Sequence, residues 1–132
     1  MAVRVADASA VAAVLFGEPG AEAAAAELEQ GDPYAPTLLP YELASVARKK
    51  IRAHPGQAAS ILGTLERLED LAISFVDADP IETVRLALRE RLSAYDASYL
   101  WLAERLGGRL VTLDHALAKV ARRRARAAAK LR

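Results

Sequence analysis

Short apolar runs alternate with longer helical segments along the chain. Apolar runs bounded by Asp, Gly or Pro predict four short strands, at residues 3–6, 34–35, 73–76 and 110–113. Apolar residues at helical spacing predict helices at residues 8–15, 21–30, 37–51, 57–71, 80–92 and 97–106, and a further helix that follows residue 114 into the C-terminal tail. Strands that alternate with helices form βαβ units. The pattern therefore predicts an α/β fold with three α/β/α layers, in which a short central parallel sheet carries helices on both faces.

The length and composition agree with one domain that spans residues 1–132. A chain of 132 residues can bury roughly two-thirds of its unfolded surface in a single core. Because 53% of the residues are hydrophobic and only 5% are aromatic, that core is aliphatic. The absence of Cys excludes disulfides, thiolate metal sites and Cys nucleophiles. No apolar run approaches the ~20 residues of a membrane span, and the N-terminus lacks a signal-peptide pattern, so we predict a soluble, cytoplasmic protein.

The charges are distributed unevenly along the chain. The net charge is +1, but the tail at residues 119–132 contains seven basic residues and no acid. The first 118 residues contain eleven basic and seventeen acidic residues. A basic tail on an acidic body indicates an anionic partner, most often a nucleic acid. The alternative is a solvated helix end, because Lys and Arg also suit the C-terminal end of the helix dipole.

Two aspartates follow predicted strands. Asp7 comes directly after the strand at residues 3–6, and Asp114 comes directly after the strand at residues 110–113. Ligands of open parallel sheets bind at the carboxyl ends of the strands, so both side chains should lie at that edge. Asp is also a favoured helix N-cap, which is an alternative role for each of them.

Two further acids lie on predicted helices. Asp96 opens the helix at residues 97–106, which is apolar nearly all round and therefore buried on several sides. Glu42 lies three residues after Leu39 and four before Val46, within or at the edge of an apolar helical stripe. A Glu on an apolar face is costly unless it is paired or bound to a metal. The alternative for Glu42 is a place at the rim, where its carboxylate reaches water.

Four carboxylates that meet would repel one another unless a cation lies between them. A carboxylate cluster without His or Cys suits Mg²⁺ or Mn²⁺, and such sites carry out phosphodiester chemistry. The chain lacks the Gly-x-Ser-x-Gly motif of hydrolases and the Gly-rich loops that bind nucleotides. The candidate catalytic and metal-binding residues are Asp7, Glu42, Asp96 and Asp114.

Four sequence pieces carry a resemblance to PIN-domain ribonucleases of the VapC toxin type. They are residues 5–9 (VADAS), 39–42 (LPYE), 95–99 (YDASY) and 110–114 (LVTLD). Their order and spacing are similar to the family pattern from about residue 3 to residue 120. The resemblance implies a PIN-like fold and a Mg²⁺- or Mn²⁺-dependent endoribonuclease that cleaves single-stranded or looped RNA.

The resemblance also implies a role for each site residue. Asp7 and Asp96 match the firmest direct metal ligands, whereas Asp114 and Glu42 match positions that bind a second ion or orient the attacking water. Ser9 and Thr112 match small hydroxyl positions that support the site through hydrogen bonds.

Family membership would further imply a type II toxin, a homodimer, and a small cognate antitoxin protein that inserts into the acidic groove. One departure concerns the C-terminus, because these domains generally finish with another short strand, whereas residues 121–132 predict a basic helix.

Two other interpretations remain open from the sequence. The chain could be a non-catalytic PIN-like module that binds RNA or protein, with the basic tail as its main contact. It could also be a doubly wound domain whose acids serve only as helix caps.

Overall fold

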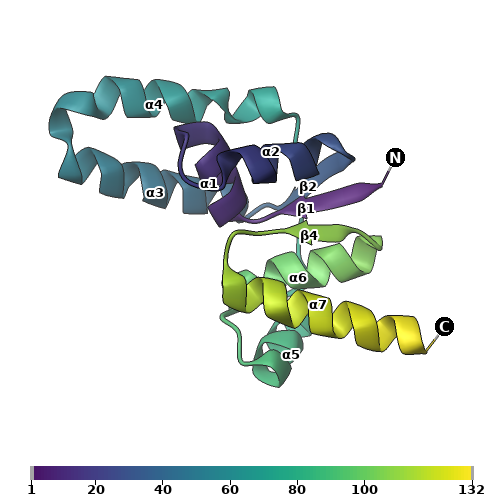
Figure 1. Ribbon diagram of the computed structural model, residues 1–132. Helices are drawn as coiled ribbons and strands as arrows, with labels where there is room; N and C mark the ends of the chain where they lie inside the picture. The colour runs from purple at the N-terminus through teal and green to yellow at the C-terminus, as the bar shows by residue number, and fades with distance from the viewer. Residues whose placement is uncertain (1, 132) are drawn as a thin grey trace.

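A four-stranded parallel sheet forms the centre of the protein, for which a computed structural model describes residues 2–131 (Figure 1). The spatial order of the strands is β3, β2, β1, β4, and all neighbouring pairs are parallel. The strands are β1 (Val3–Ala6), β2 (Asp32–Pro36), β3 (Ser74–Val76) and β4 (Arg109–Val111). The predicted short parallel sheet is therefore confirmed.

Helices fill the segments between the strands. The α-helices are α1 (Ala8–Phe16), α2 (Ala21–Glu29), α3 (Leu39–Ala53), α4 (Ala58–Glu66), α5 (Pro80–Glu90), α6 (Ala94–Leu106) and α7 (His115–Lys130). Two 3₁₀ segments, η1 (Pro55–Gln57) and η2 (Arg67–Leu71), flank α4, so the single helix predicted at residues 57–71 is wrong in detail.

Helices cover both faces of the sheet, as predicted. On one face, Ala24 of α2 packs with Ala10 of α1 and Val111 of β4. On the other face α6 lies against β1, β2 and β4, and α5 and α7 pack in turn against α6 (Figure 1). The core is mainly aliphatic, and residues at its centre such as Val5 and Leu102 are fully buried. None of the described helices is long and apolar enough to cross a membrane.

Two glycines allow β4 to lie directly beside β1. Gly107 ends α6 in the left-handed conformation, with φ of 64°. A Cβ atom on Gly108 would lie 2.6 Å from Val3 Cγ1 and 2.9 Å from the Val3 carbonyl oxygen. Any larger residue at position 108 would push the two strands apart at their amino ends.

The strand order reverses at the carboxyl ends of β1 and β4, and we call the region around this point the crevice. From β1 the chain moves to β2 and then to β3 on one side, and then crosses to β4 on the other side of β1. Ligands bind at such reversals of strand order in open α/β sheets. Asp7 lies at this point, and its N–H donates to the Val111 carbonyl at 3.1 Å.

Two predicted helix starts are wrong. Helix α6 begins at Ala94 rather than after Asp96, because the Ser93 Oγ accepts a hydrogen bond from the Asp96 N–H at 3.0 Å and caps the helix. Thr37 does not cap α3, since its hydroxyl donates to Asp77 Oδ1 at 3.1 Å.

The C-terminal tail is a helix, as predicted, and part of it is held by ion pairs. Arg124 binds Glu104 at 2.7 Å and Glu90 at 2.8 Å, and Arg123 also binds Glu90. Within the described residues no strand follows α7, and Arg132 lies outside them. The tail therefore contributes to packing on α5 and α6 as well as carrying positive charge.

Candidate active site

Asp7 lies at the centre of the crevice and is only 4% exposed. It is the N-cap of α1, with Oδ1 accepting from the Ala10 N–H at 3.0 Å. Oδ1 also accepts from the Ser9 hydroxyl at 2.7 Å, and Oδ2 accepts from the Thr112 hydroxyl at 2.5 Å. Because each carboxylate oxygen has two lone pairs, Oδ2 keeps one position for a further ligand.

The Ser9 and Thr112 hydroxyls orient Asp7 from both sides. The Ser9 Oγ accepts from the Leu113 N–H at 2.9 Å, and the Thr112 Oγ1 accepts from the Asp114 N–H at 3.0 Å. Since each hydroxyl accepts from a backbone N–H, its own proton is directed to Asp7. The two residues thus join the end of β1 to the loop after β4 and favour the ionised form of Asp7.

Asp114 lies at the surface, at the start of α7. Its Oδ1 accepts from the Leu117 N–H at 3.0 Å, so the alternative role as a helix cap is real for this residue. The cap uses only one of the two carboxylate oxygens. The negative charge of Asp114 also raises the pKa of Asp7 and of Asp96, which places all three acids in one electrostatic environment.

Glu42 enters the crevice from the first turn of α3. Its Oε1 accepts from the Tyr99 hydroxyl at 2.6 Å, and Tyr99 is 1% exposed. Burial, and next the hydrogen bond to Glu42, raise the pKa of Tyr99, so its hydroxyl stays protonated and acts as a donor. The apolar pattern of α6 places Tyr99 in the core but does not reveal this role. The available signal was that a buried Tyr needs a partner for its hydroxyl.

Asp96 lies in the first turn of α6 and is half-buried. Its backbone N–H is used in the Ser93 cap, whereas among the described residues no cation pairs with its carboxylate. Although the predicted start of the helix was wrong, Asp96 still lies within the electrostatic influence of the other acids: after burial, the charges of Asp114 and Asp7 raise its pKa.

The acids of the crevice repel one another and lack positive partners. Burial is the main cause that raises the pKa of Asp7, Glu42 and Asp96, and the mutual repulsion of the acids raises each pKa further. Hydrogen bonds from neighbouring side chains oppose these shifts without cancelling them. Between residues 2 and 131, no Lys, Arg or His forms an ion pair with any of the four carboxylates.

The donor set fits a hard divalent cation held partly through water. Carboxylate oxygens suit Mg²⁺ and Mn²⁺, and the unpaired negative charge calls for a cation. The described part of the chain contains no group of three or more His, Cys, Asp or Glu side chains close enough to form a complete metal site. Mg²⁺ sites commonly use one or two carboxylates with several waters and substrate phosphates, so the residues present are sufficient for such a site.

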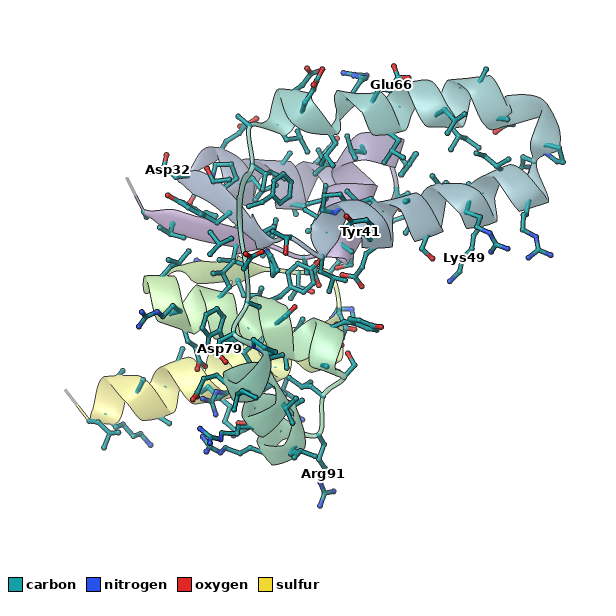
Figure 2. The ribbon with its side chains drawn as sticks, turned by 180° about the vertical axis from the view of Figure 1, so that it is seen from behind. Asp32, Tyr41, Lys49, Glu66, Asp79 and Arg91 are labelled. Carbon is teal, nitrogen blue, oxygen red and sulfur yellow. The ribbon has the colours of Figure 1, made fainter. Side chains whose placement is uncertain are left out.

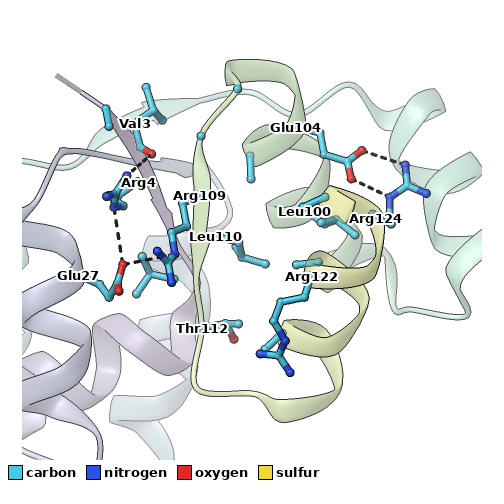
Figure 3. A pocket seen from close by; sticks show the side chains of 18 of the residues that line it. Val3, Arg4, Glu27, Leu100, Glu104, Arg109, Leu110, Thr112, Arg122 and Arg124 are labelled. Carbon is cyan, nitrogen blue, oxygen red and sulfur yellow. Dashed lines mark hydrogen bonds and ion pairs between the residues drawn. The ribbon is translucent and has the colours of Figure 1, made fainter. Parts of the chain in front are cut away.

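A groove of about 890 Å³ runs along β4, beside this crevice (Figure 3). Thr112 lies at its end next to Asp7, Glu27 of α2 lines one wall, and Arg122 of α7 lines the opposite wall. Glu27 lies 3.5 Å from Arg109 and 3.8 Å from Arg4, so one acid faces two bases. Glu104, Arg122 and Arg124 also line the groove, so four arginines stand against two glutamates, and the groove is positive on balance, in contrast to the crevice.

Comparison with known proteins agrees with this geometry. The family model for the PIN domain matches residues 4–123. Ribonuclease VapC3 of Pyrobaculum aerophilum is 33% identical over 120 residues, which cover 87% of this chain and 92% of the relative. The crystal structure of PAE2754 from Pyrobaculum aerophilum superposes with a TM-score of 0.72 at 25% identity, covering 88% of this chain and 82% of that one. The chain therefore belongs to the PIN-domain family, as its four acidic motifs predict.

Proposed function

We propose that this protein is a Mg²⁺- or Mn²⁺-dependent endoribonuclease that cleaves single-stranded or looped RNA, and that it is the toxin of a type II toxin–antitoxin pair. Membership of the PIN-domain family and similarity to a relative named Ribonuclease VapC3 support the proposal. The observation that carries it is that carboxylates from distant segments lie in one electrostatic environment and form no ion pair with a basic side chain of the described residues. A purely structural role would favour pairing such acids with Lys or Arg.

Each proposed site residue has a role that its contacts support. A bound Mg²⁺ or Mn²⁺ would activate a water and neutralise charge that develops on the phosphate. Asp7 and Asp96 are the proposed direct ligands, with Asp7 held in position by its two hydroxyl donors. Glu42 and Asp114 are proposed to hold a second ion or to orient the attacking water. Each of them keeps one oxygen free of its hydrogen-bonded partner.

The proposed partners are a small antitoxin protein and a second copy of the chain. Both are implied by the family and are supported by an apolar stripe on the outer side of α5. Ile81, Val84 and Leu88 follow helical spacing there and are each more than half exposed. Exposed apolar patches of this kind are typical of protein–protein contacts.

Cleavage of a labelled RNA that contains single-stranded loops tests the proposed activity. We expect cleavage with Mg²⁺ or Mn²⁺ and none with chelator. Asp7→Asn should reduce the rate by at least about 100-fold, because the neutral amide is a poor metal ligand. Asp79→Asn is the matched control, since Asp79 also caps a helix by accepting an N–H, at 2.9 Å, but lies at the start of α5 outside the crevice.

The result separates catalysis from the alternative of a binding module. If wild-type protein binds RNA but no divalent ion supports cleavage, the protein is a non-catalytic PIN-like module. If Asp7→Asn and Asp79→Asn cleave equally well, Asp7 has no part in the mechanism.

A further inference from the structure

Two tyrosines are the most exposed aromatic residues of the described chain. Tyr41 is 76% exposed and Tyr95 is 61% exposed, whereas Tyr99 is 1% exposed. Within residues 2–131, neither exposed hydroxyl forms a hydrogen bond and neither ring has a cation–π partner. The fold therefore gives these two rings no internal role that would explain their presence.

Each exposed tyrosine directly precedes an acid of the crevice. Tyr41 precedes Glu42 in the first turn of α3, and Tyr95 precedes Asp96 in the first turn of α6. Successive residues on a helix point about 100° apart. Each acid can thus face into the crevice while the tyrosine beside it stands at the rim.

Tyr41 and Tyr95 lie beside the same site. The hydrogen bond of 2.6 Å between Tyr99 of α6 and Glu42 of α3 joins the starts of the two helices. Glu42 directly follows Tyr41, and Tyr99 lies one turn after Tyr95 on α6, so this contact brings the two exposed tyrosines to the same site. Figure 2 shows Tyr41 at the beginning of α3, the end of this helix that lies nearest to α6.

The chemistry of the crevice favours stacking as the mode of contact at these positions. A cluster of carboxylates repels the phosphates of an approaching RNA, and no basic side chain pairs with it in the described chain. Neutral aromatic rings bind bases through their faces without any requirement for charge. In a duplex the faces of the bases are already stacked on one another, so such rings select unpaired nucleotides.

We propose that Tyr41 and Tyr95 stack on the bases of the nucleotides on either side of the phosphate held in the crevice, and that they make the site selective for unpaired RNA. This inference rests on the proposed ribonuclease function and assigns the residues that determine its substrate. The two rings are substrate-binding residues, because they contact bases and none of the reacting atoms.

Short single-stranded RNA with 2-aminopurine at one position tests this inference, since stacking quenches the fluorescence of that base. Binding is measured with chelator present, so that no cleavage occurs, and cleavage is measured separately with Mn²⁺. The variants are Tyr41→Leu and Tyr95→Leu, which keep an apolar side chain but lose the ring, together with Tyr41→Phe and Tyr95→Phe. Phe75→Leu is the control, because Phe75 is an exposed aromatic residue on the edge strand β3, adjacent in sequence to none of the four acids.

Each Leu variant should raise the dissociation constant for single-stranded RNA roughly 5- to 100-fold and abolish the quenching at one nucleotide position. In cleavage, KM should rise while kcat changes little. The Phe variants and Phe75→Leu should behave as wild type, and binding of a blunt RNA duplex should be the same for all variants.

Wild-type affinity and quenching in both Leu variants would overturn the inference. So would an equal loss in the Phe variants, which would assign the contact to the hydroxyl. If the Leu variants lose only affinity for a purified antitoxin, the tyrosines belong to a protein interface. RNA that binds and quenches without being cleaved when Mn²⁺ is added would refute the nuclease proposal alone, whereas absence of any RNA binding or cleavage by the wild type, both with chelator and with Mn²⁺, would refute both.

Discussion

The protein contains two groups of partly buried carboxylates, and the fold shifts pKa values within them in opposite directions. In the arginine cluster, formed by Glu90, Glu104, Arg123 and Arg124, each acid binds at least one guanidinium group. These contacts, led by the hydrogen bond from Arg124, lower the pKa of Glu90. In the crevice, burial and mutual repulsion raise the pKa of Asp7, Glu42 and Asp96.

The acids of the arginine cluster stabilise the fold, whereas the acids of the crevice destabilise it. Glu90 has a side chain that is 7% exposed and forms ion pairs with Arg123 and Arg124, so its charge is neutralised where it lies. The crevice acids have no such ion pairs among the described residues, so neutralisation of their charge requires a bound cation. Carboxylates that lack an ion-pair partner and have a shifted pKa are typical of functional residues.

Neutralising one acid in each group should give the largest contrast. Asp96→Asn should lower RNA cleavage by at least about 100-fold, because a proposed metal ligand is lost. Glu104→Gln should leave cleavage within about twofold of wild type, since it removes only a surface ion pair. Single-turnover cleavage with saturating Mn²⁺ measures both, and equal activities of the two variants would contradict a functional distinction between the groups.

Divalent ions should stabilise the folded protein through the crevice acids and not through the arginine cluster. Mg²⁺ or Mn²⁺ at a hundredfold excess over its dissociation constant would stabilise the wild type by about 2.7 kcal/mol. The Asp7→Asn variant should show a much smaller effect, and Glu104→Gln should respond as the wild type does. Thermal unfolding at constant ionic strength, with and without chelator, makes the measurement. Equal stabilisation of Asp7→Asn would place the ion elsewhere.

The two groups should give stability profiles of opposite slope with pH. The ordinary pKa of Asp is 3.8 and the fold raises that of Asp96, so the folded state holds this proton more tightly than the unfolded state. Ionisation of Asp96 therefore reduces metal-free stability as the pH rises from about 4 through the raised pKa. The fold lowers the pKa of Glu90 below its ordinary 4.5, so Glu90 contributes stability above that value and loses it as the pH falls through the lowered pKa.

Urea unfolding between about pH 3 and 7 with chelator present detects these slopes. Asp96→Asn should gain stability relative to wild type as the pH rises through the raised pKa of Asp96, because the amide cannot ionise. Glu90→Gln should be less stable than wild type near neutrality and approach it in acid. A stability difference for Asp96→Asn that does not change with pH would show that Asp96 ionises as freely in the folded protein as in the unfolded one.

The smallest effects should come from α7, whose basic residues also divide into two sets. Lys119, Arg126 and Lys130 are exposed, lie on one face of the helix by their spacing, and form no ion pair within the described residues. Changing each of them to Gln should weaken RNA binding roughly threefold and reduce the salt dependence of log K by about 0.7 for each phosphate that is no longer neutralised. Arg123→Gln is the matched control, because Arg123 is already bound to Glu90.

Unchanged affinity and unchanged salt dependence in all three exposed variants would make the tail structural. These single substitutions are more informative than removal of residues 121–131, which would also break the ion pairs of Arg124 with Glu90 and Glu104.

The order of strands and helices, the parallel sheet and the position of Asp7 followed from the sequence. These features depend on local patterns, because apolar periodicity and breakers act over a few residues. Asp7 directly follows β1 as predicted, and any residue in that position lies at the sheet edge. Asp114 lies three residues after the end of β4, at the cap of α7, because β4 ends at Val111 rather than at the predicted residue 113.

The start of α6 was misjudged because Ser93 and Asp96 both lie within one turn and either can act as a cap. The start of α3 was misjudged because Thr37 donates its hydroxyl proton to Asp77, 40 positions away in the sequence.

The contacts between distant segments were decided only by the tertiary structure. Tyr99 meets Glu42 across 57 positions of sequence, and Thr112 meets Asp7 across 105. The sequence also left open which arginines of the tail are paired and which are free. A side chain finds a distant partner through the packing of whole helices against the sheet, and the spacing of residues along one segment holds no information about that packing.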